Sequence, residues 1–353
     1  MQIFYEYLAN LFKKDRVTID NVIFKLHYRF TVFILVGCTL IIWLYQCLHP
    51  PIICTGDDTK KYHTTYCWIH STFTVQDNLG KEVGVGVAYP GVRSFTGREE
   101  KKDITYYQYV YFCLCLQALL FYIPHYIWKN RCSKNLELLV QNLSLPIDDE
   151  RTRREQINLL CDCFVDNLKT NNMNAWVYFC CEILNCFNVV FQSYLLNIFL
   201  GYEFVNYGSQ ILNHLHQNPM ESVDPMERIF PKLAKCTVYE WGFSGTIQRK
   251  DLICLLALNI FTEKIYAFLW FWLIILFLLS LLAVIYRIIL FCFRPIRGWS
   301  LSVGARLRDN LHINTVNKKC SVGDWFLLRL LEKNMDPVVF GEFIKRLEFI
   351  LHP

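Results

Sequence analysis

Residues 267–293 read AFLWFWLIILFLLSLLAVIYRIILFCF, a run that contains one charged residue, Arg287. A helix needs roughly 20 residues to cross about 30 Å of hydrocarbon, so this run is long enough to span a membrane. The helical form is expected because every backbone N–H and C=O group in lipid must find its partner within the segment. The run therefore predicts a transmembrane helix.

Three further stretches of the 353-residue chain have the same character. They are residues 30–48, 106–128 and 175–201. One such stretch could be a core helix of a soluble protein, but four of them in a chain that is 54% hydrophobic and 19% charged favour a membrane protein. We therefore expect an all-α membrane protein built on a four-transmembrane-helix bundle. The first 29 residues are amphipathic and basic, which does not fit a cleaved leader.

Basic residues near the spans indicate which segments face the cytoplasm. Lys and Arg lie near the spans in residues 1–29, 129–174 and 294–353, so we expect these segments and both termini to be cytoplasmic. The other two loops also contain Lys and Arg, but a similar number of Asp and Glu balances them. Residues 49–105 and 202–266 then form two extracellular loops of a multi-pass plasma-membrane protein. The net charge of +5 follows from this bias, and no basic patch with interleaved aromatics indicates a nucleic-acid partner.

The chain has 16 cysteines, and this topology places an even number of them clearly outside the cell. Cys54 and Cys67 fall in the first external loop, and Cys236 and Cys254 fall in the second. Disulfides persist in such oxidising surroundings, so we expect two bridges, although the spacing leaves all three pairings open. Cys161-Asp-Cys163 resembles half a metal site, but no second pair follows, and we expect neither a metal nor a cofactor.

The external loops and the cytoplasmic segments also carry secondary-structure signals. Residues 72–75, 81–87 and 246–248 favour strands, which predicts a small sheet shared by the two external loops. Residues 150–170, 325–331 and 338–351 are charged and helix-compatible, so we expect a cytoplasmic helical dome with a helix stop at Asn334–Pro337. The sheet and the dome complete the predicted fold.

Polar residues and a proline interrupt the spans. Pro124 predicts a kink in the second span. Arg287 lies near the cytoplasmic end of the fourth span and could extend to the interface as an anchor. The third span carries a polar stripe, which should face the bundle or a water path: Glu182, Asn185, Asn188, Gln192 and Asn197. Interhelical hydrogen bonding and a direct functional role for Glu182 both fit this stripe.

Motifs of catalysis are absent from the sequence. No nucleophile elbow, phosphate loop, metalloprotease motif or kinase set is found, so we do not expect an enzyme. His214 and His216 stand at strand spacing without an obvious third ligand, which favours solvated side chains. The sequon at Asn142 lies in the cytoplasmic loop, so the external loops offer no glycan acceptor and could approach another protein closely.

Several motifs together resemble the innexin family. The run Tyr106, Tyr107, Gln108, Tyr109 and Val110 is similar to the family signature Tyr-Tyr-Gln-Trp-Val, with Tyr109 in place of Trp. Residues 65–75 resemble the first innexin loop, residues 230–237 and 244–248 resemble the second, and residues 259–272 resemble the start of its fourth span. Residues 19–28 and 321–328 extend the likeness over nearly the whole chain. The short tail also fits a viral copy of an insect innexin.

This resemblance implies a subunit of a gap-junction channel. Eight subunits, identical or mixed with other innexins, would ring a pore in the lipid bilayer that passes ions and small molecules. Two such rings on apposed cells would dock through their external loops. An undocked hemichannel, a modulator of other innexin channels and a non-conducting adhesion protein are the alternatives. The resemblance also implies the nested disulfides Cys54–Cys254 and Cys67–Cys236.

The amphipathic N-terminal segment has two interpretations from its periodicity alone. It could lie on the inner membrane surface or fold into the pore mouth. The resemblance favours the pore, so Phe4, Glu6 and Leu8 are our candidates for pore-lining residues. The apolar Phe4 and Leu8 would pack on the first span, and Glu6 would face the conduction path.

The second external loop departs from the innexin pattern. Phe243 replaces the usual Pro and Trp241 replaces a Tyr, beside Ser244 and Gly245. These four residues are our docking candidates, because exposed aromatic side chains are common interface anchors. Inward packing of both rings against the core of the loop is the alternative. At Tyr109 we expect little effect, since the aromatic and interfacial character of Trp is retained.

Overall fold

The computed structural model describes residues 18–55, 62–78, 87–93, 95, 99–141, 150–216, 224–305 and 310–351. The side chains of residues 132–141, 304–305, 310–312 and 314 are not part of this description. Phe4, Glu6 and Leu8 lie outside the described residues, as do Asn142 and nearly all of the expected strand at 81–87. The pore-lining assignment therefore stays a prediction.

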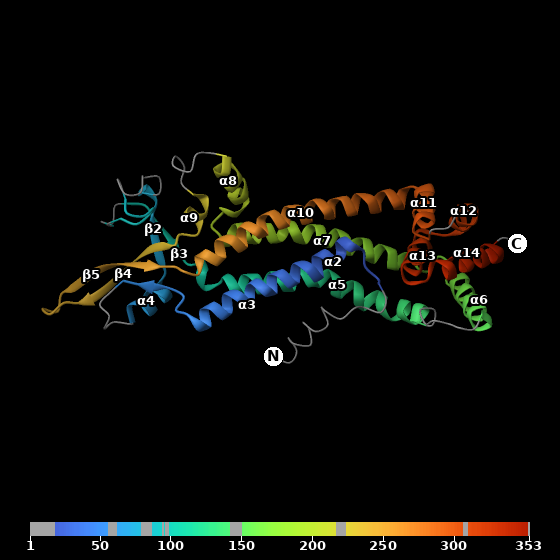
Figure 1. Ribbon diagram of the computed structural model, residues 1–353, viewed down its shortest axis with the longest axis horizontal. Helices are drawn as coiled ribbons and strands as arrows, with labels where there is room; N and C mark the ends of the chain where they lie inside the picture. Colours follow the sequence, from blue (N-terminus) through green and yellow to red (C-terminus); the bar gives the residue numbers. More distant parts are fainter. Residues whose placement is uncertain are drawn as a thin grey trace. The chain divides into compact units, whose positions relative to one another are not determined.

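Four helices are long and apolar enough to cross a membrane, as expected (Figure 1). The first of them consists of α2 (Val22–Lys25), a π-helical segment η1 (Leu26–Thr31) and α3 (Val32–Leu48). The others are α5 (Val110–Gln141), α7 (Asn172–Phe199) and α10 (Asn259–Cys292). The Asn21 side chain caps the start of α2 by accepting a hydrogen bond of 2.6 Å from the Phe24 N–H. Helix α5 continues through Pro124, where the kink stays a prediction.

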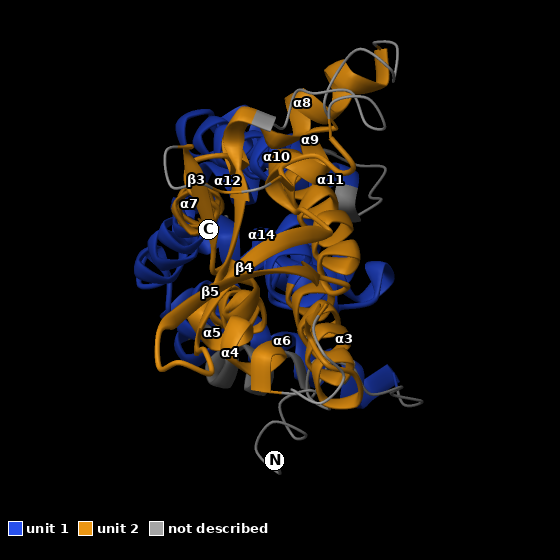
Figure 2. Ribbon diagram, turned by 90° about the vertical axis from the view of Figure 1, so that its left-hand side faces the viewer, with its two compact units in different colours: residues 1–31, 121–188, 277–353 blue, residues 32–120, 189–276 orange. Residues whose placement is uncertain are grey.

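The chain divides into two compact units, coloured separately in Figure 2. Unit 1 comprises residues 1–31, 121–188 and 277–353, and unit 2 comprises residues 32–120 and 189–276. Each unit combines part of the four long helices with smaller elements of its own. The smaller helices of unit 1 and the sheet of unit 2 correspond to the predicted dome and to the predicted sheet.

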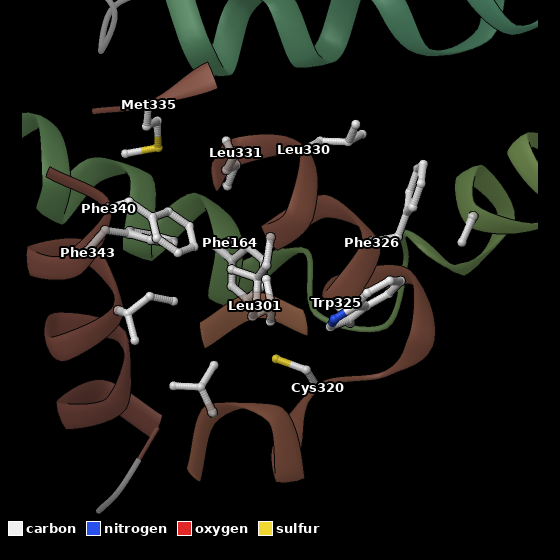
Figure 3. Close-up of a cluster of buried hydrophobic side chains, with 14 of the residues drawn as sticks. Phe164, Leu301, Cys320, Trp325, Phe326, Leu330, Leu331, Met335, Phe340 and Phe343 are labelled. Atoms are coloured by element: carbon white, nitrogen blue, oxygen red, sulfur yellow. The ribbon is translucent and has the colours of Figure 1, made fainter. Parts of the chain in front are cut away.

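The smaller helices of unit 1 surround an apolar core (Figure 3). They are α6 (Glu150–Asp166), α11 (Arg294–Ala305), α12 (Asn310–Lys319), α13 (Val322–Asn334) and α14 (Pro337–Leu351). Phe164 of α6, Trp325 of α13 and Phe343 of α14 meet in this core, all at most 3% exposed. Helix α13 ends at Asn334 and α14 begins at Pro337, which confirms the predicted helix stop.

Unit 2 contains a five-stranded antiparallel sheet in the order β1-β5-β4-β2-β3. The strands are β1 (Ile53–Cys54), β2 (Thr72–Val75), β3 (Lys101–Ile104), β4 (Leu233–Trp241) and β5 (Ile247–Leu255). Three strands come from residues 49–105 and two from residues 202–266, so the predicted sharing of one sheet is confirmed. Short helices accompany it: α4 (Tyr62–His70), η2 (Gln76–Asn78), η3 (Tyr106–Gln108), α8 (Phe204–His216) and α9 (Pro225–Ile229).

Four of the five residues of the polar stripe in the third span are buried, as predicted, and Asn197 is half-buried. Glu182, Asn185, Asn188 and Gln192 are at most 7% exposed. The prediction for Arg287 was wrong: its side chain is buried rather than extended to the interface, because it pairs with Glu182. The strand spacing inferred for His214 and His216 was also wrong, since both belong to helix α8.

Candidate functional site

Two disulfides join the segments that form the sheet. Cys54 of β1 pairs with Cys254 of β5, where the two residues are direct partners in the strand register. Cys67 of α4 pairs with Cys236 of β4. These are the nested pairs that the innexin resemblance implied. They close loops of 200 and 169 residues and therefore hold together segments that are distant in the sequence.

The two bridges lie beside each other. The sulfur atoms of Cys54, Cys67 and Cys254 are all within 4.8 Å of one another. Each of these sulfurs is already bonded in a disulfide, so the cluster is not a set of metal ligands. Because the sulfurs are so close, a free thiol produced by loss of one bridge could exchange with the other disulfide.

Strands β4 and β5 form a hairpin whose two faces differ. On the inner face, Cys236, Val238 and Leu252 are buried in the core beneath the sheet. On the outer face near the tip, the large side chains are exposed: Tyr239 61%, Trp241 77% and Ile247 67%. Trp241 is the register partner of Ile247, so these side chains form one continuous apolar surface.

A tight turn closes the hairpin at its tip. The Gly245 N–H donates to the Gly242 carbonyl at 2.9 Å, and the Gly242 N–H donates to the Thr246 carbonyl at 2.8 Å. Phe243 is thereby the second residue of a four-residue β-turn, and its ring is fully exposed. Gly245 adopts a φ of +76°, a conformation that favours glycine. The exposure of Trp241 and Phe243 excludes the inward-packing alternative in the single chain.

A carboxylate on the inner face holds the hairpin against α4. Glu240 accepts hydrogen bonds from Tyr62 and pairs with His63, both on α4. Its second oxygen lies 2.9 Å from the Lys250 Nζ on the neighbouring strand. Because Glu240 binds the inner face to α4, the outer aromatic face remains available for a partner.

The base of the outer face carries a second ionic cluster. Lys235 is 5% exposed and donates to Asp251 at 3.0 Å and to the Arg93 carbonyl at 2.6 Å. Thr237 donates to the other Asp251 oxygen at 2.9 Å. Partial burial pushes the Asp251 pKa upward, but the hydrogen bonds and the positive charges of Lys235 and Arg249 hold it below its ordinary value. This cluster joins the segment at Arg93 to the hairpin.

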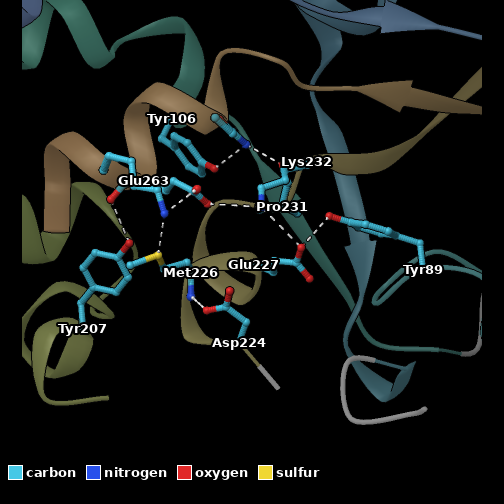
Figure 4. Close-up of polar contacts among 11 residues, drawn as sticks. Tyr89, Tyr106, Tyr207, Asp224, Met226, Glu227, Pro231, Lys232 and Glu263 are labelled. Atoms are coloured by element: carbon cyan, nitrogen blue, oxygen red, sulfur yellow. Dashed lines mark hydrogen bonds and ion pairs between the residues drawn. The ribbon is translucent and has the colours of Figure 1, made fainter. Parts of the chain in front are cut away.

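The first signature residue, Tyr106, ties η3 to the second loop (Figure 4). The Tyr106 hydroxyl donates to the Ile229 carbonyl at 3.1 Å and accepts a bond of 3.0 Å from the Asn259 side chain. The same Asn259 nitrogen donates to the Pro231 carbonyl at 2.7 Å. Burial raises the pKa of Tyr106 well above its ordinary value, so the phenol stays protonated and can donate.

Two further members of the signature tie η3 to α4. The Tyr107 hydroxyl donates to the Cys67 carbonyl at 3.3 Å, and the Gln108 side chain donates to the Trp68 carbonyl. Burial raises the pKa of Tyr107 to about 12. Val110 is fully buried, whereas Tyr109 is 56% exposed. The signature therefore positions α4, and with it the Cys67–Cys236 bridge, at the start of the second long helix.

Ionic contacts link the second-loop segment to the start of α10 (Figure 4). The Lys232 Nζ lies 3.5 Å from Glu227 and 3.8 Å from Glu263. Tyr89 donates to Glu227 at 3.4 Å, and its pKa is raised to about 12, first by burial and then by the Glu227 charge. The Tyr207 hydroxyl of α8 donates to the Glu263 carbonyl at 3.1 Å. These bonds fix the base from which the hairpin projects.

Sequence reasoning missed Glu240, His63 and Asn259 as organising residues. Glu240 is the polar member of an otherwise buried alternation in β4, which could have marked it as a paired carboxylate. Asn259 is the first residue of α10 and is fully buried, although no pattern in the sequence names its partners. Their roles depend on contacts between segments far apart in the chain.

The fold and this site define a class of protein: a four-span membrane protein with a disulfide-bonded extramembrane sheet. A sequence model of the Innexin family matches residues 20–349. Innexin inx2 of Schistocerca americana is 42% identical, over 96% of this chain and 94% of the relative. Innexin inx2 of Drosophila melanogaster is 43% identical over 96% and 93%, and Innexin shaking-B of the same species is 38% identical over 96% and 92%.

The chain belongs to the innexin family. Membership places it among multi-pass membrane proteins of gap junctions, which are channel proteins rather than enzymes. The hydrogen bonds of the signature residues and the two bridges give this assignment a structural basis in the described residues.

Proposed function

We propose that this chain is a subunit of an oligomeric pore that passes ions and small molecules between apposed cells. The exposed aromatic tip of the β4–β5 hairpin is the observation that carries the proposal. Tyr239, Trp241, Phe243 and Ile247 are large exposed side chains at or near the tip of a hairpin held by two disulfides. Exposed aromatic clusters on rigid frames are typical of protein interfaces.

In this proposal the sheet lies outside the cell and both termini lie in the cytoplasm. The disulfides support this orientation, because such bonds persist in an oxidising compartment. The outer face of the hairpin then meets the same element of a hemichannel on the apposed cell. Trp241, Phe243, Ser244 and Gly245 are the docking residues, and all four are exposed.

The pore itself is proposed to form from a ring of eight subunits. Large apolar side chains remain exposed along the long helices of the single chain, among them Phe33, Phe187 and Leu282. Lipid and neighbouring subunits would cover these faces. Glu6, with Phe4 and Leu8, is proposed to line the entrance, and Glu6→Lys would then shift ion selectivity towards anions.

Paired-cell recording tests this function. Cells that express the chain are brought into contact, and junctional conductance and single-cell current are both measured. Trp241→Ser should lower junctional conductance and leave single-cell current unchanged, because the Trp241 side chain is 77% exposed in the single chain. Trp299→Ser, at an exposed tryptophan of α11 in unit 1, is the matched control and should change neither.

Two results would contradict the proposal. Single-cell current without coupling to any partner would assign the protein to undocked hemichannels or to the modulators of other channels. Adhesion of paired cells with neither junctional conductance nor single-cell current would assign the protein a structural role only.

A further inference from the structure

A cavity of about 300 Å³ opens in unit 1, where the first membrane helix begins and the fourth ends. Helices α2 and α10 supply an apolar wall that includes Val22, Ile23, Ala283 and Leu290. Helix α13 contributes Trp325, Arg329 and Lys333 to the lining. The cavity is large enough to hold a small ligand or one end of a larger one.

Positive charge is in excess around this cavity. Arg287 is neutralised by Glu182, and Arg329 is neutralised by Glu332. Lys333 lines the cavity as well, and no carboxylate of the described residues forms an ion pair with it. The cavity thus has an apolar wall and an unneutralised cation at its rim.

The state of Lys333 supports this picture. Its pKa is lowered to about 8, first by desolvation and then by the positive charges of Arg329, Arg287 and Lys25, with Glu332 acting in the opposite direction. Crowding by like charges disfavours the protonated amine, and a bound anion would relieve this effect. At neutral pH the amine is still mostly protonated and can bind an anion.

The position of the cavity along the helices indicates the type of ligand. Val22 starts the first apolar helix, and Leu290 is close to the end of α10 at Cys292. Two of the candidate membrane spans therefore have an end beside this cavity. Lipid headgroups gather near the ends of transmembrane helices, and basic pockets between such helices bind anionic headgroups.

We propose that this cavity binds an anionic phospholipid, with a headgroup phosphate at Lys333 and the part of the acyl chain nearest the headgroup against Val22 and Leu290. The inference rests on the membrane placement of the chain and is independent of pore formation and of docking. A zwitterionic lipid lacks the net charge that Lys333 requires, and a free phosphate lacks the chain that would cover the apolar wall.

Lipid binding to the purified full-length oligomer tests the proposal. Native mass spectrometry in detergent compares dioctanoyl phosphatidylinositol 4,5-bisphosphate with dioctanoyl phosphatidylcholine and with the headgroup inositol trisphosphate alone. We expect the bisphosphate lipid to bind most tightly. Lys333→Gln should weaken its binding by about fivefold, which is the effect of losing one cation near a headgroup.

The matched control is Lys345→Gln, at an exposed lysine of α14 that does not line the cavity. This variant should bind the lipid as tightly as the unchanged protein does. The proposal is overturned if both lysine variants weaken binding equally, if phosphatidylcholine binds as tightly, or if the headgroup alone binds as well as the lipid. Both substitutions are at exposed side chains, so we expect both variants to fold. A folding defect in either variant would be detected as loss of the oligomer peak.

Discussion

The guanidinium of Arg287 holds the carboxylate of Glu182 through two parallel hydrogen bonds of 2.8 Å, from Nε and from Nη2. The Asn21 side chain donates a third bond of 2.8 Å to the same carboxylate. The guanidinium also lies over the rings of Tyr178 and Phe326, with centroid distances of 5.0 and 5.7 Å. One ion pair thereby joins α7, α10, α13 and the residue that caps α2.

Removal of one partner from this pair should destabilise unit 1 strongly. Glu182→Gln leaves the buried Arg287 charge without its carboxylate, and such changes typically cost about 3–5 kcal/mol. Replacing both groups, with Glu182→Leu and Arg287→Met, should cost less than the single change because no charge stays buried. Thermal unfolding of the detergent-solubilised protein would check this order. Glu155→Gln, at an exposed glutamate of α6, is the control, and a larger loss in the double variant would contradict the prediction.

Gly323 explains part of the tail motif that resembles innexins. Ser321 caps α13 and forms a capping box with Asp324, whose carboxylate also accepts the Lys169 N–H at 3.0 Å. The Gly323 N–H donates to the Asn172 side chain at 2.8 Å. A methyl group on Gly323 would lie 2.3 Å from the backbone of Asn171 and of Asn172. The motif thus requires close contact between two backbones.

Gly323→Ala should therefore lower stability by about 1–3 kcal/mol or more, because the overlap is with backbone that cannot rotate away. Ala is otherwise favoured over Gly in a helix by about 1 kcal/mol. Gly37→Ala in α3 is the matched control, since nothing lies within 4 Å of the added methyl group. Size-exclusion chromatography after heating gives the temperature at which each variant loses its oligomer. This temperature should fall for Gly323→Ala and stay unchanged for Gly37→Ala. Equal behaviour of both variants would show that the close contact is not maintained.

Local patterns in the sequence were sufficient for the main elements. Long apolar runs predict helices because backbone N–H and C=O groups in lipid must bond within the segment. The β-prone residues 72–75 form β2, as predicted. The partner of Arg287 was not predictable, because Glu182 is 105 residues away and helical periodicity indicates a face rather than a neighbour. His214 and His216 were misplaced because a pair two residues apart does not distinguish a strand from a helix. The exposure of Trp241 and Phe243 was not predictable, because the local sequence does not show which face of the hairpin packs against α4.

The Asp251 cluster predicts acid sensitivity of the hairpin base. The folded-state pKa of Asp251 lies below the ordinary value, so its contribution to stability is present above that value and is lost as the pH falls through the lowered pKa. Asp251→Asn should remove this contribution at neutral pH and leave Lys235 buried without its counter-charge, at a cost of about 1–3 kcal/mol. Protection factors of the β4 and β5 amides, corrected for the pH dependence of unprotected exchange, would show both effects when measured at pH 7 and at a pH below the lowered Asp251 pKa. If acid changes the variant as much as the unchanged protein, another group is responsible.

Phe243→Pro should stabilise the hairpin turn. Phe243 occupies the second position of the β-turn, where proline is favoured, and its N–H makes no hydrogen bond among the described residues. A compatible proline typically adds about 0.4–1 kcal/mol by restricting the unfolded chain, so exchange of the Gly245 amide should slow by about two- to fivefold. Phe243→Ala removes the ring without fixing the backbone and should not slow exchange. Faster exchange in the proline variant would mean that the backbone at residue 243 is incompatible with proline.

We predict that Trp241 and Phe243 at the hairpin tip determine which partner hemichannels dock. The double change Trp241→Tyr with Phe243→Pro restores the residues that are usual in innexins at these positions. It should raise coupling to other innexin hemichannels and leave single-cell current unchanged. The expected cause is the removal of the exposed Phe243 ring from the proposed docking face. Junctional conductance across a panel of innexin partners is the measurement. Unchanged coupling across the panel would show that these residues do not select the partner.

The adjacency of the two disulfides predicts a specific rearrangement. Cys54→Ser releases the thiol of Cys254, whose sulfur lies within 4.8 Å of the Cys67 sulfur. Attack of the Cys254 thiolate on Cys67 would form a Cys67–Cys254 bridge and release Cys236 as a thiolate, so the number of disulfides stays the same. Mass spectrometry of unreduced peptides should detect this bridge in the single variant. The double variant Cys54→Ser with Cys254→Ser has no attacking thiol and should keep only Cys67–Cys236. Finding only the native Cys67–Cys236 peptide in both variants would contradict this prediction. It would mean that the fold does not allow the Cys254 thiolate to attack the Cys67 sulfur.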